Sequence, residues 1–312
     1  MSGKIYSEIN KKSMINNGHR GKILDKKNNF EVIDCERCGF KHAIPIPSDK
    51  ELEEFYGKEF YSRVKPKYFS DYEEDLEWWM AAYRNHYNLL AKHTVGRRLL
   101  DIGSGPGYFL KCGREMGWDV LGFEPSKDAA EYSGKLGVEV VNDFFSGETV
   151  KKYGKFDVIY MKTVIEHILD PEKLLRDVKN ALVSGGVLCV ISPNDYNPLQ
   201  KILRENLGFE PWWVSPPQHI NYFDFKSIQS VLIKQGLSIV DSLGTFPMEF
   251  FLLSGINYIG DAKVGRQCQS RRKIFELNMY ARNPDILNDI YRFLGAKNIG
   301  REFILIAKKP LT

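Results

Sequence analysis

The segment 99–110, LLDIGSGPGYFL, constrains the fold more strongly than any other part of the chain. An apolar run leads into Asp101, and glycines then occupy alternate positions at Gly103, Gly105 and Gly107. Because glycine has no side chain, a ligand can approach the backbone N–H groups of such a turn at the start of the next helix. The segment therefore predicts a buried strand, a ligand-binding turn and a helix, in that order.

Short apolar runs alternate with amphipathic stretches throughout residues 97–193. The runs are rich in β-favouring residues and have the composition of strands that are buried on both faces. Before the last run we predict a helix over 171–183, because Asp170 can cap it, Pro171 fits its first position, and Gly185 and Gly186 follow its end. Repeated strand, helix and strand predicts an α/β fold in which right-handed crossovers build a doubly wound, mostly parallel sheet.

The chain is less regular beyond residue 193. The insert 194–223 is rich in proline and aromatic residues. Asp224 then caps a predicted helix, and strands are predicted near 237–244 and 301–309. The excursion 245–300 contains two further predicted amphipathic helices.

The balance of charge and hydropathy excludes several classes of function. The chain has 312 residues, of which 43% are hydrophobic, enough for one large core or two domains of ordinary size. Its 44 basic and 40 acidic residues are interspersed, so we expect neither a nucleic-acid partner nor a membrane partner. The N-terminus has no apolar signal region, the longest apolar patch is too short to span a bilayer, and the five cysteines are mostly isolated. We therefore predict a cytoplasmic protein with reduced thiols.

The spacing of polar residues after the glycines separates two classes of ligand. A dinucleotide fingerprint requires a third glycine where this chain has Tyr108, whose ring would crowd a pyrophosphate. Glu124 follows Gly103 by about 20 residues, the offset at which an acidic side chain accepts hydrogen bonds from ribose hydroxyls. The third run ends at Asp143 and Phe144, an acceptor for an adenine amine and a ring that packs on a base. Glu124 as the cap of the next turn, and Asp143 as an ordinary loop carboxylate, remain the alternatives.

Three stretches together resemble the class I S-adenosylmethionine-dependent methyltransferases: LLDIGSGPGYFL, GFEPS, and FDVIYMKTVIEHILDPEKLLRDVKNALVSGGVLCVISPN. The stretch 164–167, VIEH, is similar to the branch of ubiquinone-biosynthesis-type O-methyltransferases. The resemblance covers about the central third of the chain. It implies a seven-stranded sheet with the order 3-2-1-4-5-7-6 and an antiparallel last strand.

The resemblance also implies which residues bind S-adenosylmethionine. The methionine end would lie over the glycine turn, the ribose on Glu124, the adenine near Asp143, and the sulfonium beside Lys162. The predicted cofactor-binding residues are Asp101, Gly103, Ser104, Gly105, Tyr108, Phe109, Glu124, Pro125, Asp143, Phe144, Met161 and Lys162.

A sulfonium methyl group is already activated, so the protein has mainly to orient an acceptor and, where needed, remove its proton. His167 is the first candidate base, because it follows the fourth strand at the ligand edge and titrates near neutral pH. His219, in the aromatic-rich insert, is nearly as good a candidate, and Glu166 is a third. Roles in cofactor contact or architecture for His167, and in loop packing for His219, are the alternatives.

The flanking segments should determine what is methylated. We expect the insert 194–223 and the excursion 245–300, with its Arg271-Arg272 pair, to form the acceptor pocket beside the ligand edge. After the fourth strand the chain has MKTV, not the Asn/Asp-Pro-Pro-aromatic run found in enzymes that methylate base amines of nucleic acids. This departure favours a small-molecule acceptor.

The N-terminal segment has a separate character. Cys35 and Cys38 form a single C-x-x-C pair followed by glycine, the shape of a zinc knuckle. Some sugar-modifying methyltransferases of similar layout carry a four-cysteine zinc ribbon before the same Pro-x-Pro segment, and this chain lacks the first cysteine pair. His19 and His42 complete a Cys2His2 set at plausible spacing. A structural zinc on these four residues and a degenerate ribbon without metal are the two alternatives.

These observations combine into one prediction. We expect a methyltransferase that uses S-adenosylmethionine to methylate a small molecule, preferably on oxygen and with a sugar or sugar-linked metabolite as candidate acceptor. A nucleotide-cofactor oxidoreductase and a non-catalytic binding module that kept the cofactor fold are the alternatives. The predicted divisions are an N-terminal segment at 1–60, a helical cap at 61–96 and the methyltransferase domain at 97–312.

Overall fold

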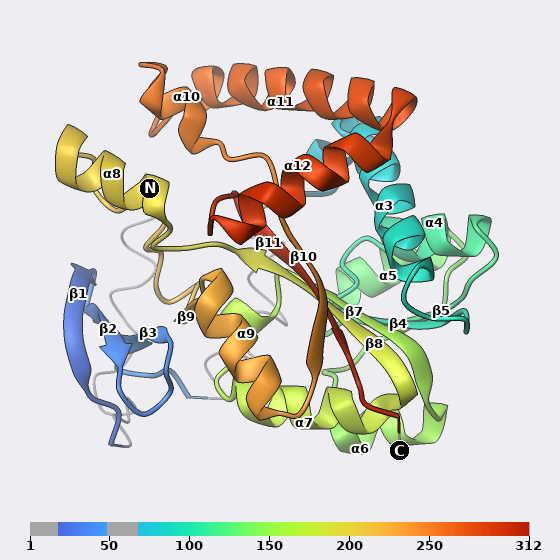
Figure 1. The fold of residues 1–312 in the computed structure, drawn as a ribbon. Helices are drawn as coiled ribbons and strands as arrows, with labels where there is room; N and C mark the ends of the chain where they lie inside the picture. Colours follow the sequence, from blue (N-terminus) through green and yellow to red (C-terminus); the bar gives the residue numbers. More distant parts are fainter. Residues whose placement is uncertain (1–17, 49–67, 312) are drawn as a thin grey trace.

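A seven-stranded sheet forms the centre of the computed structural model, which describes residues 18–48 and 68–311 (Figure 1). Its strands are β4 (Arg98–Ile102), β5 (Asp119–Phe123), β6 (Val140–Val141), β7 (Phe156–Lys162), β8 (Leu182–Pro193), β10 (Ser238–Gly244) and β11 (Glu302–Lys308). Their spatial order is β6-β5-β4-β7-β8-β11-β10, and β11 is antiparallel to both of its neighbours. Numbered along the chain within this sheet, the order is 3-2-1-4-5-7-6, which confirms the order that the resemblance implied.

Helices cover both faces of this sheet. They are α2 (Tyr68–Glu74), α3 (Leu76–Ala91), α4 (Tyr108–Glu115), α5 (Lys127–Lys135), α6 (Gly147–Val150), α7 (Pro171–Ala181), α8 (Pro198–Leu207), α9 (Phe225–Lys234), α10 (Glu249–Leu253), α11 (Ala262–Arg282) and α12 (Pro284–Ala296), with 3-10 turns η3 (Lys151–Tyr153) and η4 (Ile165–His167). Buried side chains of α7 and α9 form one core with one face, and those of α3, α4 and α12 form a second core with the other. Carboxyl ends of the parallel strands therefore meet at one edge between the two helical layers.

The predicted caps determine where two helices begin. The Asp170 side chain accepts a 2.8 Å hydrogen bond from the N–H of Lys173, with Pro171 in the first helical position. Asp224 caps α9 in the same way, accepting from the N–H of Ser227. The end of α7 differs from the prediction, because Leu182 is already extended and pairs with Phe156 as the first residue of β8.

A second, four-stranded antiparallel sheet contains β1 (Gly21–Lys27), β2 (Phe30–Cys35), β3 (Lys41–Ile44) and β9 (Asn221–Tyr222). The first three strands come from the N-terminal segment, but β9 comes from the insert 194–223. Their shared core includes Val32, Trp213 and Tyr222. The N-terminal segment and the insert, which were predicted as separate parts of the chain, thus form one structural unit. The predicted boundary between residues 60 and 61 lies outside the described residues.

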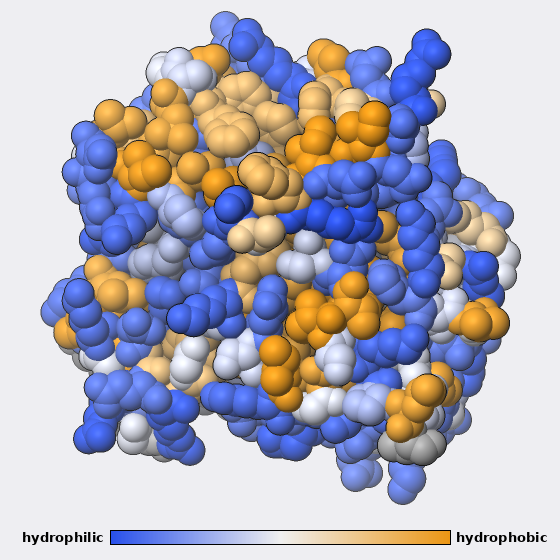
Figure 2. Space-filling model, in the orientation of Figure 1, coloured by the Kyte–Doolittle hydropathy of each residue, from blue (hydrophilic) through white to orange (hydrophobic). Residues whose placement is uncertain are grey.

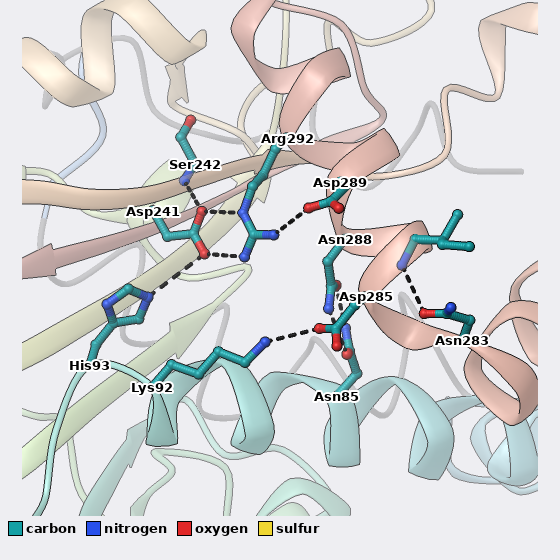
Figure 3. Close-up of polar contacts among 11 residues, drawn as sticks. Asn85, Lys92, His93, Asp241, Ser242, Asn283, Asp285, Asn288, Asp289 and Arg292 are labelled. Atoms are coloured by element: carbon teal, nitrogen blue, oxygen red, sulfur yellow. Dashed lines mark hydrogen bonds and ion pairs between the residues drawn. The ribbon is translucent and has the colours of Figure 1, made fainter.

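Polar contacts fasten the C-terminal helices to the sheet (Figure 3). Arg292 on α12 donates hydrogen bonds of 2.9 and 2.8 Å to the two carboxylate oxygens of Asp241 on β10. His93 Nε2 lies 3.7 Å from the same carboxylate. Asn85 and Asn288 exchange hydrogen bonds between α3 and α12. These contacts hold α12 firmly over one face of the sheet.

Apolar side chains gather on the upper part of the face in Figure 2, where Figure 1 places α10, α11 and α12. The exposed large hydrophobic residues of these helices are Phe250, Leu253, Ile274, Phe275, Ile286, Ile290 and Phe293. No helix in the described part of the chain is both long and apolar enough to span a membrane.

Candidate functional site

The glycine turn lies between the end of β4 and the start of α4. Gly103, Gly105 and Gly107 all have positive φ angles, of 72, 52 and 79°. A side chain at Gly103 would place its Cβ 2.7 Å from a methyl group of Val164. The N–H groups of Gly103 and Ser104 both donate to the carbonyl of Phe123 on β5, at 2.8 and 3.1 Å. Glycine is therefore required for both the backbone path and the close packing of this turn.

Glu124 lies directly beneath the turn. Its two carboxylate oxygens accept hydrogen bonds of 2.9 Å from the N–H groups of Gly105 and Ser126. The side chain is buried, and burial raises the pKa of Glu124 to about 7, although the two amide donors oppose the shift. Each oxygen keeps a second lone pair for a hydroxyl donor. The position suits the ribose-binding role predicted for Glu124.

Two further polar groups line the base of the turn. Asp101 is buried, and burial together with the nearby Glu124 carboxylate raises its pKa well above the usual range. Ser104 is also buried, and its Oγ has no hydrogen-bond partner among the described residues. An orphaned buried hydroxyl costs free energy unless a ligand or water satisfies it. The residues of the turn thus fit a polar ligand such as the amino-acid end of S-adenosylmethionine.

The ends of β5 and β6 approach each other beside Glu124. Asn142 donates hydrogen bonds of 3.0 Å from its amide to the carbonyls of Glu124 and Pro125. Asp143 and Phe144 follow at the surface, where the Phe144 ring is 41% exposed. The sequence assigned an adenine-contacting role to these two residues, but it did not identify Asn142, which ties the two strand ends together.

The aromatic residues at the start of α4 have different surroundings. The Tyr108 hydroxyl lies 2.8 Å from that of Tyr132, and its ring stacks on Tyr72 with 5.4 Å between centroids. The Phe109 ring instead packs between Tyr160 and Tyr87 in the core. A contact from Phe109 to a ligand in the turn would therefore involve its main chain.

Lys162 ends β7 at the same edge, while Met161 before it is fully buried. Lys162 Nζ lies 3.3 Å from a carboxylate oxygen of Glu302 and 4.9 Å from the centre of the Trp79 ring. These side chains, with Thr245, border a cavity of about 30 Å³. Burial opposes ionisation of Glu302, but Lys162 and neighbouring arginines hold its pKa below the usual value. The pairing offsets the Lys162 charge near the predicted sulfonium position.

All three candidate bases meet at the turn η4. The Ser192 hydroxyl donates to one oxygen of the buried Glu166 carboxylate at 2.9 Å, and His167 Nε2 lies 3.9 Å from the other. His167 Nδ1 donates to the carbonyl of Gln218, and the His219 ring centre is 5.1 Å from that of His167. Burial raises the pKa of Glu166 to about 8. The cluster can move a proton, and its three donor groups lie within 4.8 Å of one another, as cation ligands do.

The four predicted metal ligands also come together, beside the N-terminal sheet: Cys35 and His42 are on β2 and β3, His19 precedes β1, and Cys38 lies in the turn between β2 and β3. His19 Nδ1 lies 3.1 Å from His42 Nε2, 3.3 Å from the sulfur of Cys38 and 3.6 Å from that of Cys35. Tetrahedral zinc with ordinary bond lengths would separate two nitrogens by about 3.3 Å, and a nitrogen from a sulfur by about 3.6 Å. The observed separations therefore suit this geometry.

The surroundings of His42 and Cys38 affect how these two side chains could bind a cation. His42 Nδ1 donates to the carbonyl of Ala43 at 3.0 Å, which leaves the lone pair of Nε2 facing the cluster. Burial, and then the neighbouring Cys35, raise the pKa of Cys38 to about 12. Cys38 would remain a thiol at neutral pH unless a cation displaced its proton.

Comparison with known families identifies the chain. The sequence pattern of the family described as "Methyltransferase domain" matches residues 68–242, which includes the glycine turn, Glu124 and the Glu166 turn. The chain belongs to this methyltransferase family. With its seven-stranded sheet, it is a class I S-adenosylmethionine-dependent methyltransferase domain.

Several named proteins are similar in sequence to this methyltransferase. A ubiquinone biosynthesis O-methyltransferase of Caulobacter sp. (strain K31) is 31% identical over 132 residues, 40% of this chain and 52% of the relative. A tRNA U34 carboxymethyltransferase of Campylobacter concisus is 28% identical over 55% of this chain and 63% of the relative. The C-methyltransferase NovU of Streptomyces niveus is 26% identical over 47% of this chain and 34% of the relative. The matched regions span from about a third to under two thirds of these proteins.

A solved structure supports the fold of the methyltransferase. A SAM-dependent methyltransferase from Archaeoglobus fulgidus superposes with a TM-score of 0.50 at 19% identity, covering 78% of this chain and 99% of that one. The named relatives differ in the atom and the molecule that they modify, so family membership leaves the acceptor open.

Proposed function

We propose that this methyltransferase transfers the methyl group of S-adenosylmethionine to a small-molecule acceptor, preferably to oxygen. The observation that carries the proposal is the glycine turn, which Glu124 closes from below and in which the buried Ser104 hydroxyl has no protein partner among the described residues. Such a turn offers backbone donors, a carboxylate and a hydroxyl to a polar ligand at the start of a helix.

The chain's own residues would hold and orient the cofactor. The bound sulfonium supplies an already activated methyl group. Glu124 would accept hydrogen bonds from the ribose hydroxyls, and Asp101 and Ser104 would bind the polar methionine end. Phe144, exposed at the end of β6, would pack on the adenine. Lys162 would keep its charge paired with Glu302, which limits its repulsion of the sulfonium.

His167 is our proposed base for a hydroxyl acceptor. Its Nδ1–H donates to the carbonyl of Gln218, so Nε2 is the ring atom that accepts a proton. His219 lies beside it on the insert and is the alternative base. Glu166 would be a poorer base at neutral pH, because its raised pKa keeps its carboxyl group protonated.

We infer a small acceptor, with a sugar or sugar-linked metabolite as the candidate, bound between the insert 194–223 and the excursion 245–300. Basic and acidic residues are interspersed in the sequence, which disfavours a nucleic-acid groove. The match to a tRNA-modifying relative makes an RNA acceptor the alternative to test. None of the five cysteines forms a disulfide bond, which supports the proposed cytoplasmic location.

Calorimetry separates the proposed function from its alternatives. S-adenosylmethionine and S-adenosylhomocysteine should bind the purified chain, and NAD should not. Tight binding of NAD alone would support an oxidoreductase. Cofactor binding without methyl transfer to candidate sugars, phenols or tRNA would support a binding module.

We also propose that a structural zinc ion occupies the cluster of His19, Cys35, Cys38 and His42. The matching interatomic separations support a tetrahedral site, and its place in the N-terminal sheet separates it from the glycine turn. Zinc would replace the weak contacts among these side chains with coordinate bonds and so stabilise the sheet.

Elemental analysis of protein purified without a His-tag tests the zinc proposal. About one equivalent is expected, falling several-fold in Cys35→Ser. Cys112→Ser is the matched control, because Cys112 is also buried but lies on α4. Less than a tenth of an equivalent in the parent chain would show that the ribbon is degenerate.

A further inference from the structure

The N-terminal sheet and the η4 turn share one short strand. On one side of β9, Asn221 lies opposite His42 of β3, and Tyr222 lies opposite Lys41. The N–H of Ala43 also donates to the carbonyl of Ile220 at 2.7 Å. A candidate zinc ligand, His42, is therefore on the strand that positions this part of the insert.

The other side of the same segment holds the turn with Glu166 and His167. The Asn221 side chain donates to the carbonyl of Ile165 at 3.0 Å and to that of Ile168 at 2.7 Å, which brackets the turn. The N–H of Ile220 donates to the carbonyl of Glu166 at 2.9 Å. Asn221 is only 3% exposed, so water cannot readily replace these bonds.

We propose that Asn221 is a positioning residue that couples the zinc site to the Glu166–His167 turn. A cation on His42 would fix β3, β3 fixes β9 by strand pairing, and Asn221 on β9 fixes the turn. The inference rests on the proposed function and the proposed zinc. It adds that the metal, although remote from the methyl group, controls the geometry of the candidate base.

Physical coupling of this kind is reciprocal. If the bound metal orders the turn, then a substitution that frees the turn should weaken metal binding, by up to the same factor. Asn221 is not a ligand in the cluster, so a loss of metal affinity on its substitution reports the coupling itself. A purely local packing role for Asn221 predicts no such loss.

Hydrogen–deuterium exchange of the full chain tests, without any substitution, whether bound zinc orders the Glu166–His167 turn. The N–H groups of His167 and Ile220 are hydrogen-bonded within this connection and should exchange slowly in the zinc-loaded protein. Removing the metal with a chelator should accelerate exchange in peptides covering 164–168 and 218–221 by roughly tenfold or more. Unchanged exchange in these peptides would overturn the proposal.

Substitution of Asn221 tests whether freeing the turn weakens zinc binding. Asn221→Ala should speed exchange at 164–168 with zinc present and should lower zinc affinity in competition with a chelating dye. Asn194→Ala is the matched control, because Asn194 is equally buried and donates to two carbonyls, those of Asn298 and Gly300. Equal effects of the two substitutions would refute the specific role of Asn221.

Calorimetry with S-adenosylmethionine, run on the same samples, distinguishes the possible failures. A chain that binds zinc and cofactor but shows no linkage contradicts only the coupling. A chain that binds cofactor but no zinc contradicts the coupling and the zinc site together and leaves the methyltransferase proposal standing. A chain that binds zinc and shows the linkage but does not bind cofactor contradicts only the proposed function.

Discussion

The carboxylate of Glu124 accepts a hydrogen bond of 2.9 Å from the N–H of Gly105. The same side chain therefore shapes the turn and faces the position proposed for the ribose. Replacing it changes the site in two ways, through the ligand contacts that are lost and through the turn that is released.

Glu124→Ala should weaken S-adenosylmethionine binding by roughly 1.5–3 kcal/mol, because charge-assisted hydrogen bonds are removed. Titration calorimetry measures the change. Glu139→Ala is the control, since Glu139 is exposed on the approach to β6. An unchanged dissociation constant in Glu124→Ala would place the ribose elsewhere.

Gly103→Ala should lower cofactor affinity roughly tenfold, equivalent to about 1.4 kcal/mol, and reduce stability. The new Cβ would lie 2.7 Å from Val164, and the backbone φ is +72°. Gly117→Ala separates the two causes, because Gly117 has φ of +80° with nothing within 4 Å. It should cost only the left-handed backbone penalty, about 1–2 kcal/mol of stability, and leave affinity unchanged. Similar affinities in both variants would contradict a ligand in the turn.

Asp241→Asn should destabilise the fold by roughly 1.5–3 kcal/mol at pH 7, because it removes the charged partner of Arg292. Burial opposes the shift, but Arg292 holds the pKa of Asp241 below its usual value. The stabilisation is therefore present above the unfolded pKa, near 4, and is lost as pH falls through the folded pKa. Urea unfolding at pH 7 and pH 3 should show the difference shrinking in acid. Asp285→Asn is the control. Asp285 is exposed at the start of α12, the helix that carries Arg292, and its substitution should change stability little at either pH.

The free energy of unfolding of the Glu166→Gln variant should rise relative to that of the parent chain as pH increases from about 4.5 to about 8. Burial raises the pKa of Glu166 to about 8, so in this interval unfolding releases a proton that the folded parent retains. The parent therefore loses stability over this window, while the neutral amide does not titrate. Unfolding curves at pH 5, 7 and 9 measure the trend, and parallel profiles would contradict the buried, protonated carboxyl.

His167→Ala should reduce methyl transfer to a hydroxyl acceptor by about 10²–10⁴-fold while cofactor affinity is kept. His219→Ala should reduce it less, because Nε2 of His167 remains able to accept the proton. Single-turnover rates with saturating cofactor make the comparison. A larger loss in His219→Ala would move the base to the insert, and near-normal rates in both variants would exclude both histidines.

Local sequence signals predicted the elements that local forces determine. The glycine turn and the Asp170 cap are both present. The strand order, which depends on long-range pairing, was implied by the family resemblance and not by local signals. The four predicted metal ligands meet, although only spacing suggested the two histidines. Their roles, like those of the other candidate site residues, remain predictions.

Long-range pairings escaped prediction for a physical reason. Strand β9 is two residues long and has no periodicity that could mark it. Lys162 and Glu302 are far apart in sequence and meet only because β11 inserts beside β8. The sequence also gives no signal for Ser192 beside Glu166, since a serine near the end of a buried strand is unremarkable without its partner.

The strand that the insert contributes to the N-terminal sheet limits how this protein can be re-engineered. Residues 18–48 and 194–223 flank the cofactor-binding region in sequence, yet β3 and β9 complete the same sheet. A chimera that borrows another enzyme's insert to change its acceptor would leave β3 with an unpaired edge, and a truncation that removes the N-terminal strands would do the same to β9. These two segments must therefore be exchanged together, although strands β4 to β8 lie between them in the sequence.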